Sequence, residues 1–235
     1  VEEILIEKSA TGRSAWTRLF DETSAALRFP FKKKSLTQAE ILNLLSDADP
    51  ETRKIAGKSL SEVLENNKRI FGMILNVISR DRFIEDNKRG FKRIMSSRNL
   101  DNDVEDEVVD KLVNTVDKSM PRLTHRYYKW KANQFGQTRL DWWDRNAPLP
   151  HSSENLIEWS EAKDIILDSF SSFHPEISNL AELFFKNNWI DASLRKGKAS
   201  GAFAHPSVPS LHPYVLVNYQ GKIRDVMTLA HELGH

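Results

Sequence analysis

Two histidines and a glutamate near the end of the sequence have the types and the spacing of a hydrolytic metal centre. Leu229 to His235 reads LAHELGH, which contains the pattern H-E-x-x-H as His231, Glu232 and His235. On a helix, residues four apart differ by about 40° around the axis and by roughly 6 Å along it, so both imidazoles can meet one ion. Glu232 is turned about 100° from His231, so it can face a water on that ion.

Zinc at this position would supply the chemistry of amide hydrolysis, because it lowers the pKa of a bound water and polarises a carbonyl. Glu232 would then be the general base, which takes the proton of the water and passes it to the leaving amine. The sequence has no cysteine, so any metal must be held by histidine and carboxylate side chains. We therefore predict zinc as the cofactor, with His231 and His235 as ligands.

A second interpretation of the motif is a helix terminus with two exposed histidines. A bare H-E-x-x-H is expected by chance in roughly one chain in a hundred of this length. Its apolar surroundings favour a buried helix, in which two histidines and a glutamate would be costly without a shared partner. These neighbours are Met227, Leu229, Ala230 and Leu233. The pattern therefore favours a metal site.

The elements that must position the motif are mostly helical. Thr37 and Glu40 form a capping-box pair, and Asp49 is an N-cap before a proline at the first helical position. A long helix follows, because apolar residues recur at three- and four-residue steps from Leu60 to Ile78. Further helices are predicted over residues 82–95, 104–116, 123–135, 156–170 and 176–186.

The pattern changes after Asn188, where glycines and prolines interrupt the helical period. Two short strands are predicted there, over residues 202–204 and 214–219, and Asp225 is the predicted N-cap of the motif helix. The expected fold is mainly α, with a small β-sheet before the motif helix. We expect a helical region over residues 1–188 and the start of a catalytic region over residues 189–235.

Composition excludes several other classes of protein. The 235 residues are 40% hydrophobic, enough for a globular core, and 34 Lys and Arg against 33 Asp and Glu give a net charge of +1. We therefore expect neither nucleic acid nor membrane as a partner, and the basic run at residues 32–34 is best explained as a solvated loop. The sequence shows no secretory signal and no apolar run of about 18 residues, so a cytoplasmic protein is expected.

Several blocks of the sequence together resemble the oligoendopeptidase F family of zinc metallopeptidases, relatives of thimet oligopeptidase. They are TLAHELGH, HPYVLVNYQGKIRDVM, GKASGAF and NNWIDASLRKG, and upstream ILNVISRDRFIEDNKRGF, HRYYKWKANQFG and DWWDRNAPLP. The resemblance covers essentially the whole chain. It implies a mostly helical fold enclosing a deep channel, zinc on the H-E-x-x-H helix, and short unstructured peptides as substrates.

Residue by residue, the resemblance implies zinc on His231 and His235 and the general base at Glu232. It also implies that Gly201, Ala202 and Phe203, and the strand from His212 to Tyr219, lie on the substrate side of the cleft. An extended peptide can bond a strand edge through its backbone, which agrees with this assignment. His205 and His212 could donate to a substrate carbonyl or to the oxyanion, or serve as structural hydrogen-bond partners. Tyr214 and Phe203 fit core or cleft wall better than catalysis.

The sequence departs from the family in one respect. The resembling enzymes take a third zinc ligand, a glutamate, from a later helix, and no residue follows His235 here. We therefore expect this chain to be an incomplete fragment, inactive by itself, whose partner is the missing C-terminal portion of the same enzyme. The alternative is a noncatalytic helical peptide-binding module.

Overall fold

The computed structural model describes residues 1–150 and 155–235, which form two compact units. The first unit contains residues 1–36 and 41–150, and the second contains residues 37–40 and 151–235. Two of the predicted helices therefore fold together with the motif segment. The division at residue 188, which was expected from composition, is not the division between these units and stays a prediction about where the catalytic region begins.

The first unit begins with two helices and a hairpin. Helices α1 (Glu2–Ser9) and α2 (Arg13–Ala26) precede strands β1 (Phe29–Phe31) and β2 (Lys34–Leu36), which pair antiparallel. Lys32 takes a left-handed conformation in the turn, with φ of 53°. The basic run that was predicted to be a solvated loop spans this turn and Lys34, the first residue of β2. Its three lysines are exposed, which confirms that they are solvated, although Lys34 belongs to a strand and not to a loop.

Helix α3 (Gln38–Leu44) and helix α4 (Pro50–Arg89) start where their capping residues predicted. The Glu40 carboxylate accepts bonds from the backbone and hydroxyl of Thr37, both at 2.7 Å. The Asp49 carboxylate accepts the N–H groups of Glu51 and Thr52, both at 3.1 Å. These bonds satisfy backbone donors that the first helical turn leaves without partners.

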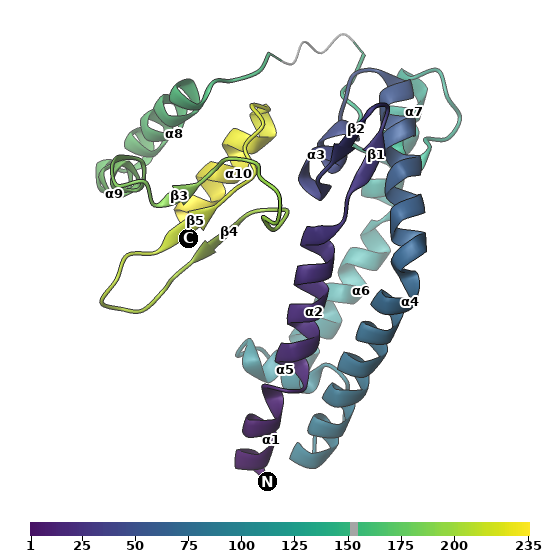
Figure 1. Ribbon diagram of the computed structural model, residues 1–235, viewed down its shortest axis with the longest axis vertical. Helices are drawn as coiled ribbons and strands as arrows, with labels where there is room; N and C mark the ends of the chain where they lie inside the picture. The colour runs from purple at the N-terminus through teal and green to yellow at the C-terminus, as the bar shows by residue number, and fades with distance from the viewer. Residues whose placement is uncertain (151–154) are drawn as a thin grey trace. The chain divides into compact units, whose positions relative to one another are not determined.

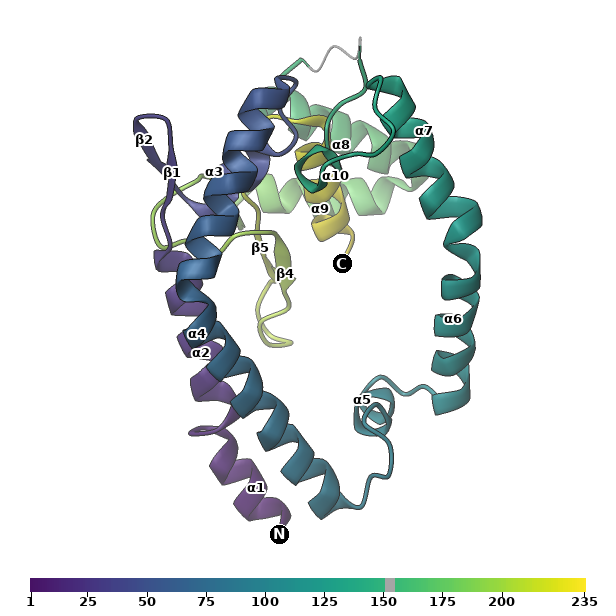
Figure 2. The same cartoon turned by 90° about the vertical axis from the view of Figure 1, so that its right-hand side faces the viewer.

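Helix α4 is longer than predicted, and the separate helix expected over residues 82–95 is wrong. The helix continues to Arg89 and ends at Gly90, whose φ of 81° is left-handed. The ion pairs Arg82–Asp86 and Arg89–Glu85 are four residues apart and extend the helix beyond its apolar stripe. Along this unit α2 lies beside α4 (Figure 2).

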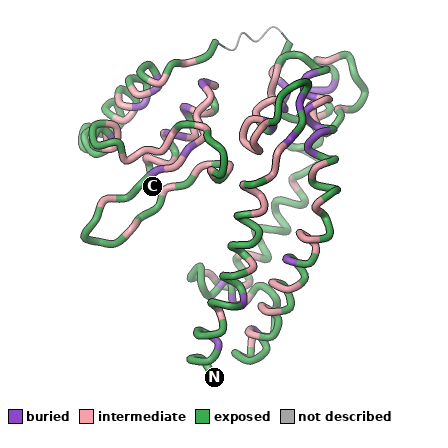
Figure 3. Tube along the Cα trace, in the orientation of Figure 1, coloured by how far each residue is buried: buried purple, intermediate pink, exposed green. Residues whose placement is uncertain are grey.

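The rest of the first unit is also helical. It contains α5 (Ser96–Asp101), α6 (Asp106–Ser119), the π-helical turn η1 (Pro121–His125), α7 (Arg126–Gln134) and the 3-10 turn η2 (Trp142–Asp144). The expected helices over 104–116 and 123–135 are thus confirmed in place. The core of this unit lies where the hairpin, α3 and the start of α4 meet, and its buried members are Phe29, Phe31, Ile41, Leu45, Ala56 and Leu60 (Figure 3).

The second unit places two helices and the motif helix around a small sheet (Figure 1). It contains α8 (Trp159–Phe173), α9 (Pro175–Lys186), β3 (Ile190–Asp191), β4 (Phe203–His205), β5 (Tyr214–Leu216) and α10 (Ile223–Gly234). The strand order is β3-β5-β4, with β3 parallel and β4 antiparallel to β5. Helix α8 starts three residues later than predicted, after Glu158, and β3 is a strand that the sequence pattern missed.

The core of this unit joins α8, the sheet and α10. Its buried members are Ala162, Ile166, Val215, Val217, Val226 and Leu229. Together the two units confirm the predicted mainly helical fold with a small sheet before the motif helix. Within residues 1–150 and 155–235, no helix is both long and apolar enough to cross a membrane.

Candidate active site

The motif helix α10 starts earlier than predicted, because Asp225 is not its N-cap. Lys222 occupies that position, and Asp225 is the third helical residue. The Asp225 carboxylate accepts the N–H groups of Gln220 at 2.9 Å and of Lys222 at 3.1 Å. A carboxylate in the first turn also interacts favourably with the helix dipole. The bond from the Lys222 amide to the Asp225 carboxylate is the acidic half of a capping box. The predicted N-cap, Asp225, was therefore three residues too late.

Gly221 fixes the start of α10 against the segment before α8. Its φ is +87°, and its carbonyl accepts the N–H of Ile157 at 2.8 Å. A Cβ at position 221 would lie 3.3 Å from the Ile157 carbonyl oxygen, which is a tight contact. Tyr219 donates its hydroxyl to the same oxygen at 2.7 Å. The entry to the motif helix is therefore held by backbone contacts that favour glycine.

Helix α10 buries only one face, so the sequence argument from a buried helix is partly wrong. Val226 and Leu229 are 6% and 0% exposed, whereas Met227 is 67% exposed. His231 and His235 are exposed, and Glu232 is half-buried. The apolar residues at positions 226, 229, 230 and 233 share the core face by their spacing, which leaves the two histidines on the other side.

The two histidines of the motif lie together, as their spacing predicted. The Nε2 atom of His235 is 3.2 Å from the Nε2 atom of His231, and the rings are nearly perpendicular at 86°. Two imidazole nitrogens bound to one zinc at about 2.0–2.1 Å and separated by this distance would subtend about 100°, close to a tetrahedral angle. The donor set and the spacing of the two nitrogens therefore fit zinc.

A structural zinc site has four protein ligands, and a catalytic zinc site has three. Two histidines would supply half of the first set or two-thirds of the second. Across residues 1–150 and 155–235, no group of three or more histidine, aspartate or glutamate side chains is arranged to hold a metal. Glu232 follows His231 directly and so lies about 100° around the helix from it.

Within the part of the chain that the structure describes, β4 is an edge strand of its sheet, and α10 packs against it. Val215 donates its N–H to Trp189 on the β3 side at 3.0 Å. In an antiparallel pair, hydrogen-bonded and non-bonded positions alternate, so Ala204, opposite Val215, directs its N–H and C=O away from β5. The peptide groups of Ala204 therefore lie on the open edge.

The side chains of the predicted substrate segment divide between the two faces of the sheet. Ala202 and Ala204 pack against the core, whereas Phe203 and Tyr214 are 45% and 50% exposed on the opposite face. Phe203 and Tyr214 contribute to a hollow of about 240 Å³. The hollow is lined by Asn188, Trp189, Ile190, Asp191, Phe203, Tyr214, Val215 and Leu216.

The two candidate histidines of this segment have different surroundings. His212 stacks on Trp189, with ring centroids 3.6 Å apart and planes 7° apart, and its Nδ1 lies 3.1 Å from the Pro213 carbonyl. His205 is exposed at the end of β4, and its Nδ1 accepts the N–H of Ser207 at 3.1 Å. Gly201, with φ of +87°, precedes β4, and its carbonyl accepts a bond from Asn218. These contacts do not test the predicted role of any of these residues.

Sequence reasoning missed Lys198, which organises the connection between β3 and β4. Its side chain is 1% exposed, and its ammonium donates to the carbonyls of Asp191, Ser193 and Val217 at 2.7–2.9 Å and to the Asp191 carboxylate at 3.1 Å. Two bonds of 2.6 Å from Arg195, together with Lys198, lower the pKa of Asp191 to about 2. A lone lysine in a glycine-containing loop gives no sequence signal for this role.

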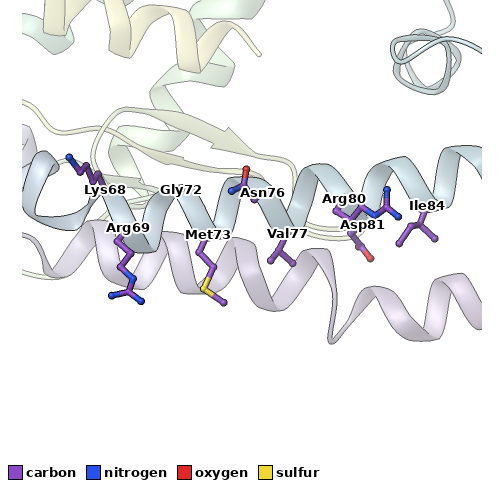
Figure 4. A pocket seen from close by; sticks show the side chains of 9 residues that line it. All are labelled: Lys68, Arg69, Gly72, Met73, Asn76, Val77, Arg80, Asp81 and Ile84. Atoms are coloured by element: carbon purple, nitrogen blue, oxygen red, sulfur yellow. The ribbon is translucent and has the colours of Figure 1, made fainter.

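A larger hollow, of about 650 Å³, belongs to the first unit and runs along one stretch of α4 (Figure 4). Its lining residues are Lys68, Arg69, Gly72, Met73, Asn76, Val77, Arg80, Asp81 and Ile84. It is open and contains none of the residues that the sequence predicted for the site. The motif residues therefore lie apart from this hollow.

The chain is mainly helical, and its H-E-x-x-H helix packs against β4 of a small sheet. The chain belongs to Peptidase family M3, whose profile matches residues 43–235. Among curated relatives, it is 26% identical over 241 aligned positions to oligopeptidase PepF of Bacillus subtilis (strain 168). It is 30% identical over 217 positions to an oligoendopeptidase F homolog of Borreliella burgdorferi.

These two alignments cover 100% and 91% of this chain but only 36% of each relative. The solved structure of PZ peptidase A with an inhibitor superposes on 94% of this chain with a TM-score of 0.85, at 20% identity, and 40% of that protein is matched. The structural likeness confirms the fold. The family and the relatives confirm the resemblance to oligoendopeptidase F that the sequence blocks indicated.

Proposed function

We propose that this chain carries part of the active site of a zinc-dependent endopeptidase that hydrolyses short peptides. The observation that carries the proposal is the 3.2 Å separation of the Nε2 atoms of His231 and His235. This separation suits two ligands of one zinc ion, and family membership supports a peptidase. When bound, zinc would lower the pKa of a water and polarise the scissile carbonyl.

Glu232 is the general base in this proposal. Its carboxylate takes one proton from the attacking water, whose oxygen forms a bond to the carbonyl carbon of the substrate. The same carboxyl group then gives the proton to the nitrogen of the leaving amine as the C–N bond breaks. Glu232 is half-buried and directly follows the first of the two histidines on α10.

The open edge of β4 is the proposed binding place for the peptide main chain. Ala204 directs one N–H and one C=O to this edge, so an extended substrate can form ladder bonds there with little dependence on its side chains. The exposed rings of Phe203 and Tyr214, with His212 beside Tyr214, offer apolar contacts on the neighbouring face. A peptide without fixed structure fits this mode, because a folded protein does not present a free extended strand.

The third protein ligand and the remaining oxyanion donors belong, in this proposal, to polypeptide that is not part of this sequence. The chain spans 36% of the length of the curated relatives it matches. Two histidines alone leave most of the coordination to waters, which neither fix the geometry nor exclude solvent. We therefore expect weak zinc binding and no appreciable hydrolysis from these 235 residues by themselves.

The test is hydrolysis of a fluorogenic peptide by the longest native polypeptide that carries this sequence. Activity should disappear when a chelator removes the metal and return when zinc is added back. The noncatalytic peptide-binding alternative predicts peptide binding without cleavage at any zinc concentration. Cleavage that persists unchanged after the metal has been removed would refute the zinc mechanism.

A further inference from the structure

His205 is held in one hydrogen-bonding state by its own loop. An amide N–H can only donate, so the bond from Ser207 to the Nδ1 atom of His205 requires a lone pair on Nδ1. In the neutral ring the proton must then lie on Nε2. His205 is exposed, so a donor on this ring can meet a ligand from solvent.

The residue that donates this bond has an unfavourable backbone conformation. Ser207 has φ of +59°, a left-handed conformation that a residue with a side chain adopts at a cost. Its amide lies 3.1 Å from Nδ1, two residues beyond the ring that it contacts. Strained backbone of this kind persists where surrounding structure or function requires it.

Pro206, which follows His205, leaves one position on the open edge of β4 without a backbone donor. In β4 the backbone N–H and C=O groups of every second residue point to the open edge. An added strand would therefore pair with positions 202 and 204, and with position 206 if the strand continued. Residue 206 is proline and has no N–H. A peptide carbonyl opposite this position therefore meets no backbone donor.

We propose that the Nε2–H of His205 replaces the missing ladder donor, and binds the main-chain carbonyl of an extended peptide where it passes Pro206. The inference rests on the proposed function, because it places the peptide on the open edge of β4. In this proposal His205 is a substrate-binding residue that recognises a main-chain peptide group. The affinity should therefore depend little on the substrate side chain at this position. The Ser207 amide holds the ring in the tautomer that can donate.

The first test is the tautomer itself. Long-range ¹H–¹⁵N spectra of the 235-residue chain, at a pH where the ring is neutral, should show His205 protonated at Nε2. Ser207→Gly should keep this tautomer, because glycine retains the amide and adopts positive φ without a side-chain penalty. A His205 ring protonated at Nδ1 in the unmodified chain would overturn the proposal.

The second test is binding of a short peptide with blocked ends, followed by amide shifts of the full chain. The peptide should shift Ala204 in the unmodified chain. His205→Phe keeps a ring but loses the donor, and should raise the Kd about three- to tenfold. His205→Gln offers an N–H donor and should remain within about twofold of the unmodified chain, and His174→Phe is the matched control at an exposed histidine of the same unit.

Unchanged affinity in His205→Phe, with Ala204 still shifted, would overturn the role of His205 and leave the peptidase proposal standing. A peptide that leaves Ala204 unshifted in the unmodified chain would also overturn it. The peptidase proposal fails separately, through cleavage that does not depend on zinc. An amide fingerprint of each variant shows whether it is folded, and His205→Gln decides the question if His205→Phe does not fold.

Discussion

The Nε2 atoms of His231 and His235 lie 3.2 Å apart on successive turns of α10, on the side of the helix that faces away from the core. When both imidazoles are neutral, the Nε2–H of one ring can donate to the lone pair on the Nε2 of the other, whereas a metal ion would accept a lone pair from both nitrogens at once. The arrangement follows from helix periodicity and requires no distant contact. It is therefore the part of the site that the sequence specifies most directly.

Replacement of one ligand should weaken zinc binding strongly. His235→Ala leaves a single imidazole, and we expect the zinc affinity to fall by at least about tenfold, since loss of even an outer partner of a ligand costs on the order of 10–100-fold. Calorimetric titration of the chain with zinc measures the change. His174→Ala removes an exposed histidine elsewhere in the same unit and should leave the affinity unaltered; equal losses in the two variants would argue against a specific site.

Replacement of the base should separate binding from turnover. Glu232→Gln has nearly the same shape but cannot accept a proton, so hydrolysis by the intact native polypeptide should fall by about 10²- to 10⁴-fold. Zinc content should stay the same, because Glu232 is not a ligand. Metal analysis beside a peptide-cleavage assay checks both expectations, and near-normal turnover in the variant would exclude Glu232 as the base.

The Asp191 carboxylate should contribute stability that depends on pH. Its pKa is about 2 in the folded chain and lies near 3.8 without its partners, so its contribution is fully present above about pH 4 and is lost as the pH falls toward 2. Asp191→Asn should lower the free energy of unfolding by about 1 kcal/mol at pH 7, a value reduced for solvent screening because the side chain is 35% exposed.

The loss of unfolding free energy caused by Asp191→Asn should become smaller between pH 4 and pH 2. Urea titrations at several pH values can measure this change. Asp164→Asn, at an exposed aspartate of α8, serves as the control. A penalty that is independent of pH would mean that the bonds of Asp191 with Arg195 and Lys198 do not stabilise its charged form.

Lys198 should be needed for the loop that leads into the edge strand. Lys198→Met removes an ammonium that donates to three carbonyls and a carboxylate, and each buried acceptor left without a partner costs about 1–3 kcal/mol. We expect a loss of about 2–4 kcal/mol of stability and faster amide exchange at Phe203, whose backbone pairs with Leu216 in β5. Lys186→Met at an exposed lysine is the matched control, and equal exchange rates in the two variants would count against this role.

Local signals in the sequence predicted much of the fold. The pairs Thr37–Glu40 and Asp49–Pro50 mark helix starts because capping depends on residues within one turn. The end of α4 was predicted wrongly, since its apolar stripe fades before residue 82 and ion pairs four residues apart continue the helix. The exposure of Met227 was missed because periodicity gives the spacing of apolar residues but not which of them reach the core.

The candidate site could be predicted only where it depends on neighbours in sequence. His231, Glu232 and His235 follow from one helix, whereas Lys198 contacts Val217 across 19 positions, and no local pattern marks that contact. The tautomer of His205 depends on the left-handed conformation of Ser207, which propensities do not predict for a serine.

X-ray absorption at the zinc edge of the zinc-loaded chain measures whether His231 and His235 together bind one metal ion. We expect two imidazole nitrogens at about 2.0–2.1 Å from zinc, and loss of this imidazole scattering in a variant with alanine at both positions. A spectrum with no imidazole contribution, or one that is the same in the double variant, would contradict this expectation.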